Sequence, residues 1–136
     1  MPKTKKVKYI YAVGRRKSAS ARVRLFKGKG ENTINGISID KYFPGSIFKN
    51  SWIKPFKLTE TIDKYFVTVR VGGGGKNGQL DAVVHGVARA LAKVEKEKFR
   101  FSLKKAGLLT RDPRIRERRK IGTGGKARRK KQSPKR

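Results

Sequence analysis

The sequence predicts one small domain that combines strands and helices, followed by a long basic arm without a core of its own. Three observations lead to this prediction. Apolar residues alternate with polar ones, as in strands, at several places between residues 9 and 71. A long stretch with a helical apolar stripe begins near residue 79. The last 26 residues, 111–136, hold 13 Lys or Arg, two acids and two bulky apolar side chains, so they cannot build a core.

Length and charge narrow the class of protein. The 136 residues suffice for one domain with a modest core. The net charge of +29, from 38 basic and 9 acidic residues, is too large for an ordinary enzyme and penalises compaction without a counter-charge. Nucleic acid is the expected partner, with an anionic membrane second. The chain has no cysteine and one histidine, which leaves no expected metal site, catalytic centre or cofactor.

The first elements form a hairpin with a basic loop. A short β-prone run at residues 9–13 is expected to end at Gly14. In the next strand, Ala21, Val23 and Leu25 alternate with Arg22 and Arg24, which places arginines on one strand face. A face of arginines without acids favours contact with phosphate. The alternative is a solvated polar face.

The middle of the chain is expected to hold short elements. Asn35-Gly36 favours a tight hairpin turn. A helical turn at residues 40–43 should stop before Pro44, and residues 47–52 form an amphipathic fragment that places Trp52 in the core. Residues 64–71 alternate as a half-buried strand.

Two helices are expected to complete the domain. The first runs from about residue 79 to 98, with an apolar stripe that packs on the sheet and a charged, solvated end at residues 93–98. The second spans residues 100–106 and stops at Gly107, which suits a left-handed cap. Leu108 and Leu109 then pin the chain before the arm departs.

A glycine-rich loop, residues 72–78, lies between the expected strand and helix. It satisfies the GxGxxG spacing of dinucleotide sites, but the acid expected at the end of a second strand falls on the same helix. The phosphate-loop pattern fails because no Ser or Thr follows Gly-Lys. The remaining interpretation is a turn whose N–H groups at a helix start bind an RNA phosphate, together with Lys76. The alternative is a tight turn without a ligand.

Two further features are interpreted as structural. His85 shares a helix with Arg89, and no Ser, Cys or carboxylate is placed to make it a base, so a packed or capping histidine is expected. The aromatic residues do not resemble the paired aromatics of RNA-binding sheets. Base stacking is therefore not the expected main mode. The aromatics considered are Tyr9, Tyr11, Phe26 and Phe66.

Five motifs occur in an order that resembles the family of ribosomal protein nine of the small subunit. They are GRRKSASARV at 14–23, NGISIDKYF at 35–43, VTVRVGGGGKNGQLDAVVHGVARAL at 67–91, KKAGLLTRDPRIRERRKIG at 104–122 and the terminal Lys-Arg. The resemblance implies a single α+β domain with a mostly antiparallel four-stranded sheet packed with helices. It also implies the left-handed βαβ connection found in the second domain of ribosomal protein five. The expected division is a lead-in at 1–8, a globular domain at 9–109 and an extended basic arm at 110–136.

The same resemblance implies a structural role in the ribosome, in the cytoplasm of a bacterium or in a plastid. The protein is expected to bind the 3′ major domain of the small-subunit rRNA in the head, beside other head proteins. The arm is implied to thread to the peptidyl site, where Lys135 and Arg136 contact the tRNA. The expected rRNA-binding residues are Arg15, Arg16, Lys17, Arg22, Arg24, Gly73, Gly74, Gly75, Lys76, Arg111, Arg114, Arg116, Arg118, Arg119, Lys120, Lys126, Arg128, Arg129, Lys130 and Lys131.

Two other classes of protein fit the sequence less well. A nonspecific DNA-compacting protein predicts basic repeats around a trivial core, which this chain lacks. An enzyme requires a cluster of titratable groups in a pocket, whereas nine acids and one histidine are scattered along the chain.

Overall fold

A computed structural model describes residues 9–115 as one α+β domain built on a mixed sheet. The lead-in at 1–8 and residues 116–136 of the expected arm lie outside the described part. The sheet has five strands instead of the expected four, because the tight turn at Asn35-Gly36 joins two strands of two residues each. In spatial order the strands are β1 (Ile10–Arg16), β2 (Ala19–Lys27), β5 (Tyr65–Gly72), β3 (Thr33–Ile34) and β4 (Ile37–Ser38).

The sheet is mostly antiparallel, as expected. Only β3 and β5 pair in parallel, with Thr33 beside Thr68 and Ile34 beside Val69. Between these two strands the chain forms β4 and two helices, α1 (Ile39–Tyr42) and α2 (Ser46–Thr59). The left-handed course of this crossover stays a prediction from the resemblance.

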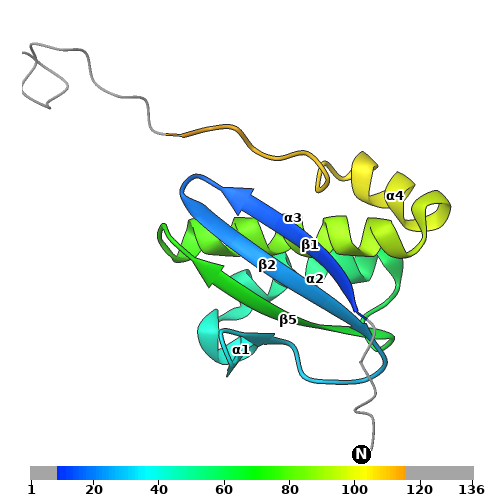
Figure 1. The fold of residues 1–136 in the computed structure, drawn as a ribbon, viewed down its shortest axis with the longest axis horizontal. Helices are drawn as coiled ribbons and strands as arrows, with labels where there is room; N and C mark the ends of the chain where they lie inside the picture. The colour runs from blue at the N-terminus through cyan, green and yellow to red at the C-terminus, as the bar shows by residue number, and fades with distance from the viewer. Residues whose placement is uncertain (1–8, 116–136) are drawn as a thin grey trace, which may run out of the picture.

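The long helices cover one face of the sheet and leave the other open (Figure 1). Helix α3 (Lys76–Val94) packs on β1 and β2, and α2 and α4 (Lys96–Lys105) pack on α3. The core lies between this layer and the sheet, with Val23, Val67 and Leu91 almost inaccessible to solvent. Burying side chains of this size contributes about 1.5–3 kcal/mol each. Trp52 lies in this core, as expected.

Helix boundaries differ from the expectation in two places. Helix α2 runs from Ser46 to Thr59 and includes Pro55, although proline lacks the N–H of a helical hydrogen bond. Because Pro55 is buried beside Trp52 and Phe56, packing offsets that loss. Helix α3 ends at Val94, and Glu95 adopts an extended conformation before α4 begins. Two helices were expected here, at residues 79–98 and 100–106. The break between them lies at Glu95 instead of near residue 99, which lets Phe99 and Leu103 turn into the core.

Gly14 does not end the first strand, contrary to the expectation. It lies inside β1, paired with Ala21 of β2, where the strand backbone touches helix α3 at Gly86. A Cβ atom on Gly14 would lie 1.9 Å from the Ala82 carbonyl oxygen, and one on Gly86 would lie 2.6 Å from a methyl carbon of Val23. The two glycines therefore fix a close approach of β1 and α3 that no larger residue permits.

Candidate nucleic-acid interface

The open face of the sheet gathers three arginines from two strands. Arg22 of β2 lies directly opposite Arg70 of β5, and Arg24 lies opposite Thr68 and Tyr11 on its two sides. All three arginine side chains are exposed. Like charges placed directly opposite each other in a sheet repel, so Arg22 and Arg70 favour an anion between them.

These side chains surround a hollow of about 650 Å³. Its floor and rim are formed by Tyr11, Arg22, Arg24, Thr33, Gly36, Thr68, Val69 and Arg70. Among residues 9–115, no carboxylate lies within ion-pair distance of Arg22, Arg24 or Arg70. The hollow thus combines uncompensated positive charge with the hydroxyl groups of two threonines and one tyrosine, which is the chemistry of a phosphate site.

One end of the open face is filled by aromatic rings. Phe26 and Phe66 stack with ring centres 5.2 Å apart, and Tyr9 lies against Phe26 at 5.7 Å. The Arg24 guanidinium lies over the Tyr9 ring at 5.0 Å. Phe26 and Phe66 are half-buried, in agreement with their expected place as core and rim groups. Arg24 connects this cluster to the hollow, because it lies over Tyr9 and also lines the hollow.

The glycine loop packs against the turn of the basic hairpin. The turn consists of Lys17 and Ser18, between the paired residues Arg16 and Ala19, and Lys17 has a φ of +52°. Gly73 and Gly74 also have positive φ, and a Cβ atom on Gly73 would lie 2.4 Å from the Ser18 carbonyl oxygen. The predicted site residues Lys17 and Gly73–Gly75 therefore form one exposed corner of the molecule.

Helix α3 begins at this corner without a side-chain cap at Gly75. Uncapped N–H groups at a helix start attract anions. Lys76 is directed elsewhere, because its ammonium group donates to the Tyr42 carbonyl oxygen at 3.3 Å and lies 5.6 Å from that ring centre. The loop geometry agrees with the phosphate interpretation, while Lys76 lies beside α1.

The free edge of β1 is bound by three side chains of α3 spaced four residues apart. Lys93 donates to the Tyr11 carbonyl oxygen at 2.8 Å, and Arg89 donates to that of Val13. The Arg15 N–H donates to Nδ1 of His85 at 3.4 Å. Alternate residues of an edge strand expose their backbone groups on the same side, and here helix side chains satisfy them.

His85 also contacts the segment that leads into the arm. Its Nε2 lies 3.2 Å from the Leu109 carbonyl oxygen, so a neutral ring that donates from Nε2 and accepts at Nδ1 satisfies both contacts. Burial lowers the pKa of His85, and the positive charges of Arg89 and Arg111 lower it further, against the raising effect of the Leu109 hydrogen bond. This is the packed histidine that was expected.

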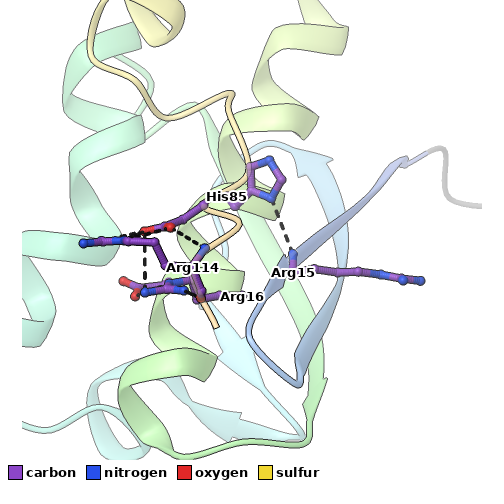
Figure 2. A network of polar contacts seen from close by, with 6 residues as sticks. Arg15, Arg16, His85 and Arg114 are labelled. Atoms are coloured by element: carbon purple, nitrogen blue, oxygen red, sulfur yellow. Dashed lines mark hydrogen bonds and ion pairs between the residues drawn. The ribbon is translucent and has the colours of Figure 1, made fainter. Parts of the chain in front are cut away.

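Arg16 lies at the centre of an ion-pair cluster with the arm root, residues 107–115 (Figure 2). Its side chain is 10% exposed and lies 3.5 Å from both Asp81 of α3 and Asp112. It also donates to the Arg114 carbonyl oxygen. Arg114 in turn forms an ion pair of 2.6 Å with Asp112. Its hydrogen bonds and charge hold the pKa of that carboxyl well below its usual range.

The predicted site residues therefore separate into groups. Arg15 is exposed, and Figure 2 shows its side chain directed away from Arg16. Arg111 is exposed, whereas Arg16 and Arg114 are engaged in ion pairs within the protein. The arm residues Arg116, Arg118, Arg119, Lys120, Lys126, Arg128, Arg129, Lys130, Lys131, Lys135 and Arg136 lie outside the described part.

Sequence reasoning missed Arg70. Its signal was present, because Arg70 alternates with the buried residues Val69 and Val71 and so faces the same side as Thr68. Only the pairing of β5 with β2 shows that this side is the one carrying Arg22. None of the helices within residues 9–115 is long and apolar enough to cross a membrane.

Comparison with known families gives a match that covers nearly all of the chain. Residues 14–136 match the model of the family described as ribosomal protein S9/S16. The matched region contains β2, β5, α3 and the whole arm, and begins within β1. This is a family of structural, non-enzymatic constituents of the ribosome. Because the match covers far more than half of the sequence, the chain belongs to the ribosomal protein S9 family.

Proposed function

We propose that the protein is a structural constituent of the small ribosomal subunit, where it binds rRNA of the head and extends its arm to the tRNA in the peptidyl site. The observation that supports this most directly is the group of arginines on the open face. Arg22 and Arg70 lie opposite each other, and no carboxylate of residues 9–115 forms an ion pair with them. A folded protein that keeps such a surface gains stability when a polyanion binds.

Three surfaces would share the contacts with rRNA in the 3′ major domain. The open face offers Arg22, Arg24 and Arg70. The corner of Lys17 and Gly73–Gly75 offers backbone N–H groups. The arm supplies a further 13 Lys or Arg in residues 111–136. Contacts of these kinds position RNA without reading its bases.

The arm root would define where the arm leaves the domain. Arg16 binds Asp112 and the Arg114 carbonyl oxygen, and His85 binds the Leu109 carbonyl oxygen. These contacts hold residues 109–114 against β1 and α3. A fixed starting direction reduces the conformational entropy that the arm loses when it enters RNA.

Incorporation into subunits tests the first part of the proposal. Full-length protein and a variant lacking residues 116–136 are each added to subunits reconstituted without this protein, which are then washed in high salt. Full-length protein should co-sediment, and the shortened variant should be lost as salt rises, since fewer phosphates are contacted. Failure of the full-length protein to co-sediment would refute an rRNA-binding role.

Release of tRNA tests the second part. Removing only Lys135 and Arg136 leaves 11 of the 13 basic residues of 111–136, so subunits should assemble normally. Dissociation of peptidyl-site tRNA should become faster by a similar factor for every tRNA, because two charge-assisted contacts to its backbone are lost. A control that replaces both residues by alanine separates charge from chain length. Unchanged release in both variants would remove the tRNA contact from the proposal.

A further inference from the structure

The hollow on the open face contains more than positive charge. Tyr11 lies at its rim with 44% of its surface exposed, and the hydroxyl groups of Thr33 and Thr68 line it beside the arginines. We propose that this hollow binds an unpaired stretch of RNA, with its phosphates on Arg22 and Arg70 and one base stacked on Tyr11. The inference rests on the proposed function and names the form of RNA that the open face selects.

The Tyr11 ring is available for stacking, unlike its neighbour. Tyr9 packs against Phe26 and lies under Arg24, whereas no aromatic or cationic group within residues 9–115 packs on the ring of Tyr11. The Tyr11 backbone is held by β2 and by Lys93. A rigid backbone with a free ring is the arrangement used to stack unpaired bases.

The shape of the hollow favours a single strand over a double helix. Its volume of about 650 Å³ is that of a pocket which encloses a small ligand. A double helix exposes its phosphates but keeps its bases stacked inside, where Tyr11 has no access to a base face. An unpaired strand brings both a phosphate and a free base into the same small volume.

The hydroxyl groups give the hollow a further preference for RNA. Thr33 and Thr68 are neighbours in the parallel pairing of β3 and β5, and both are half-buried. Each threonine hydroxyl donates and accepts hydrogen bonds, as does the ribose 2′-hydroxyl. The hollow therefore offers a partner to each part of a ribonucleotide: phosphate, sugar and base.

The experiment compares two strands of equal charge on full-length protein. One is a short unstructured oligouridine, and the other is an abasic ribose-phosphate strand of the same length. The arm contacts both strands through its basic side chains, and it adds no aromatic ring that stacks on a base, because residues 111–136 contain no aromatic side chain. Wild-type protein should bind oligouridine about fivefold or more tightly than the abasic strand, since base stacking adds that much.

Variants assign this preference to the hollow. Tyr11→Leu should abolish the difference between the two strands, and Tyr11→Phe should retain it. Arg70→Gln should weaken the binding of both strands. It should also lower the slope of log affinity against log salt by about 0.7, the value for one phosphate contact. Arg100→Gln is the matched control, because it removes an exposed arginine from α4 on the helical side of the domain. Thermal unfolding of each variant checks that the domain remains folded.

The inference would be overturned by equal affinity of wild-type protein for the two strands, by a preference that survives Tyr11→Leu, or by an equal loss for Arg70→Gln and Arg100→Gln. An RNA hairpin bound better than oligouridine after correction for charge would also contradict it. If Tyr11→Leu protein enters subunits normally while wild-type protein shows no base preference, only this inference fails. If wild-type protein does not enter subunits, the proposed function fails instead.

Discussion

The open face and the arm root both contain arginines, but they use them in opposite ways. On the open face, Arg22 and Arg70 are exposed and face each other without a carboxylate partner among residues 9–115. At the arm root, Arg16 is almost buried between Asp81 and Asp112. Arg16 and Arg22 lie on the two strands of one hairpin. Basic residues close in sequence can therefore bind an external anion or hold the protein's own chain.

The distribution of acids explains the difference. The chain has only nine acidic residues, and two of them, Asp81 and Asp112, form ion pairs with Arg16. Asp81 lies in α3 on the helical side of the sheet and Asp112 follows α4, so neither compensates the charge of the open face. We infer that Arg16 is satisfied before any RNA binds, whereas Arg22 and Arg70 are satisfied only in the complex.

The largest effect is expected at the close approach of β1 and α3, because both the open face and the arm root depend on the position of β1. Gly14→Ala would place a Cβ atom 1.9 Å from the Ala82 carbonyl oxygen and force β1 away from α3. Because backbone must move, the loss in free energy of unfolding should be about 3 kcal/mol or more. Denaturant unfolding measures it. Gly75→Ala is the control, since no atom lies within 4 Å of the added carbon and Gly75 is extended. Equal stability of the two variants would contradict the close approach.

The next largest effect is expected at the corner formed by Lys17 and Gly73–Gly75. Gly73→Ala combines a φ of +79° with a Cβ atom 2.4 Å from the Ser18 carbonyl oxygen, so it should lower the free energy of unfolding by about 2 kcal/mol. It should also displace the hairpin turn and weaken RNA binding. Denaturant unfolding and RNA titration measure the two effects. RNA binding unchanged by Gly73→Ala would mean that the loop is a tight turn without a ligand.

A smaller effect separates the arm root from the open face. Arg16→Gln removes the donor to the Arg114 carbonyl oxygen, a hydrogen bond of about 1 kcal/mol, and should raise the open population of the arm root about fivefold. Trypsin should then cleave between Arg114 and Ile115 faster by that factor, as followed by mass spectrometry. Arg22→Gln, on the open face, should leave this rate unchanged. Similar acceleration by both variants would erase the distinction between the regions.

The smallest effect concerns His85. Its neutral ring accepts from the Arg15 N–H, and burial lowers its pKa below 6.5, so the unfolded chain binds more protons near that pH. The contribution of this contact to the free energy of unfolding is complete above pH 6.5 and is lost as pH falls through the lowered pKa of His85. The chain has one histidine, so a single ring signal in an NMR titration reports the value. A pKa at or above 6.5 would contradict the packed, neutral ring.

The sequence predicts the elements of this fold better than their boundaries. Alternation correctly placed β2 and β5, and the Asn35-Gly36 turn and the Gly107 cap were confirmed by their positive φ values. Gly14 was misread because a glycine that ends a strand and one that admits a helix look alike in sequence. The break between the last two helices was expected near residue 99 and lies at Glu95. It was misplaced because the charged residues there are good helix formers, and only core packing of Phe99 favours a new direction.

Only those residues of the candidate site that local alternation places could be predicted from the sequence. Alternation alone located Arg22 and Arg24, since it fixes which strand face they occupy. The ion pairs of Arg16 depend on Asp112, 96 positions away, and no local pattern predicts such a contact. The role of Arg70 depends on strand order, because β5 pairs with β2 and not with β4, the strand that precedes it in sequence.

The salt dependence of RNA binding tests most directly whether the arginines of the open face bind RNA while Arg16 binds the protein's own chain. Full-length wild-type protein, Arg16→Gln and the double variant Arg22→Gln/Arg70→Gln are titrated with the same RNA over a range of salt concentrations. The slope of log affinity against log salt should fall by about 1.4 to 1.8 for the double variant, which loses two phosphate contacts, and should stay unchanged for Arg16→Gln. A slope lowered by Arg16→Gln and unaffected by the double variant would show that the arginines had been assigned the wrong way round.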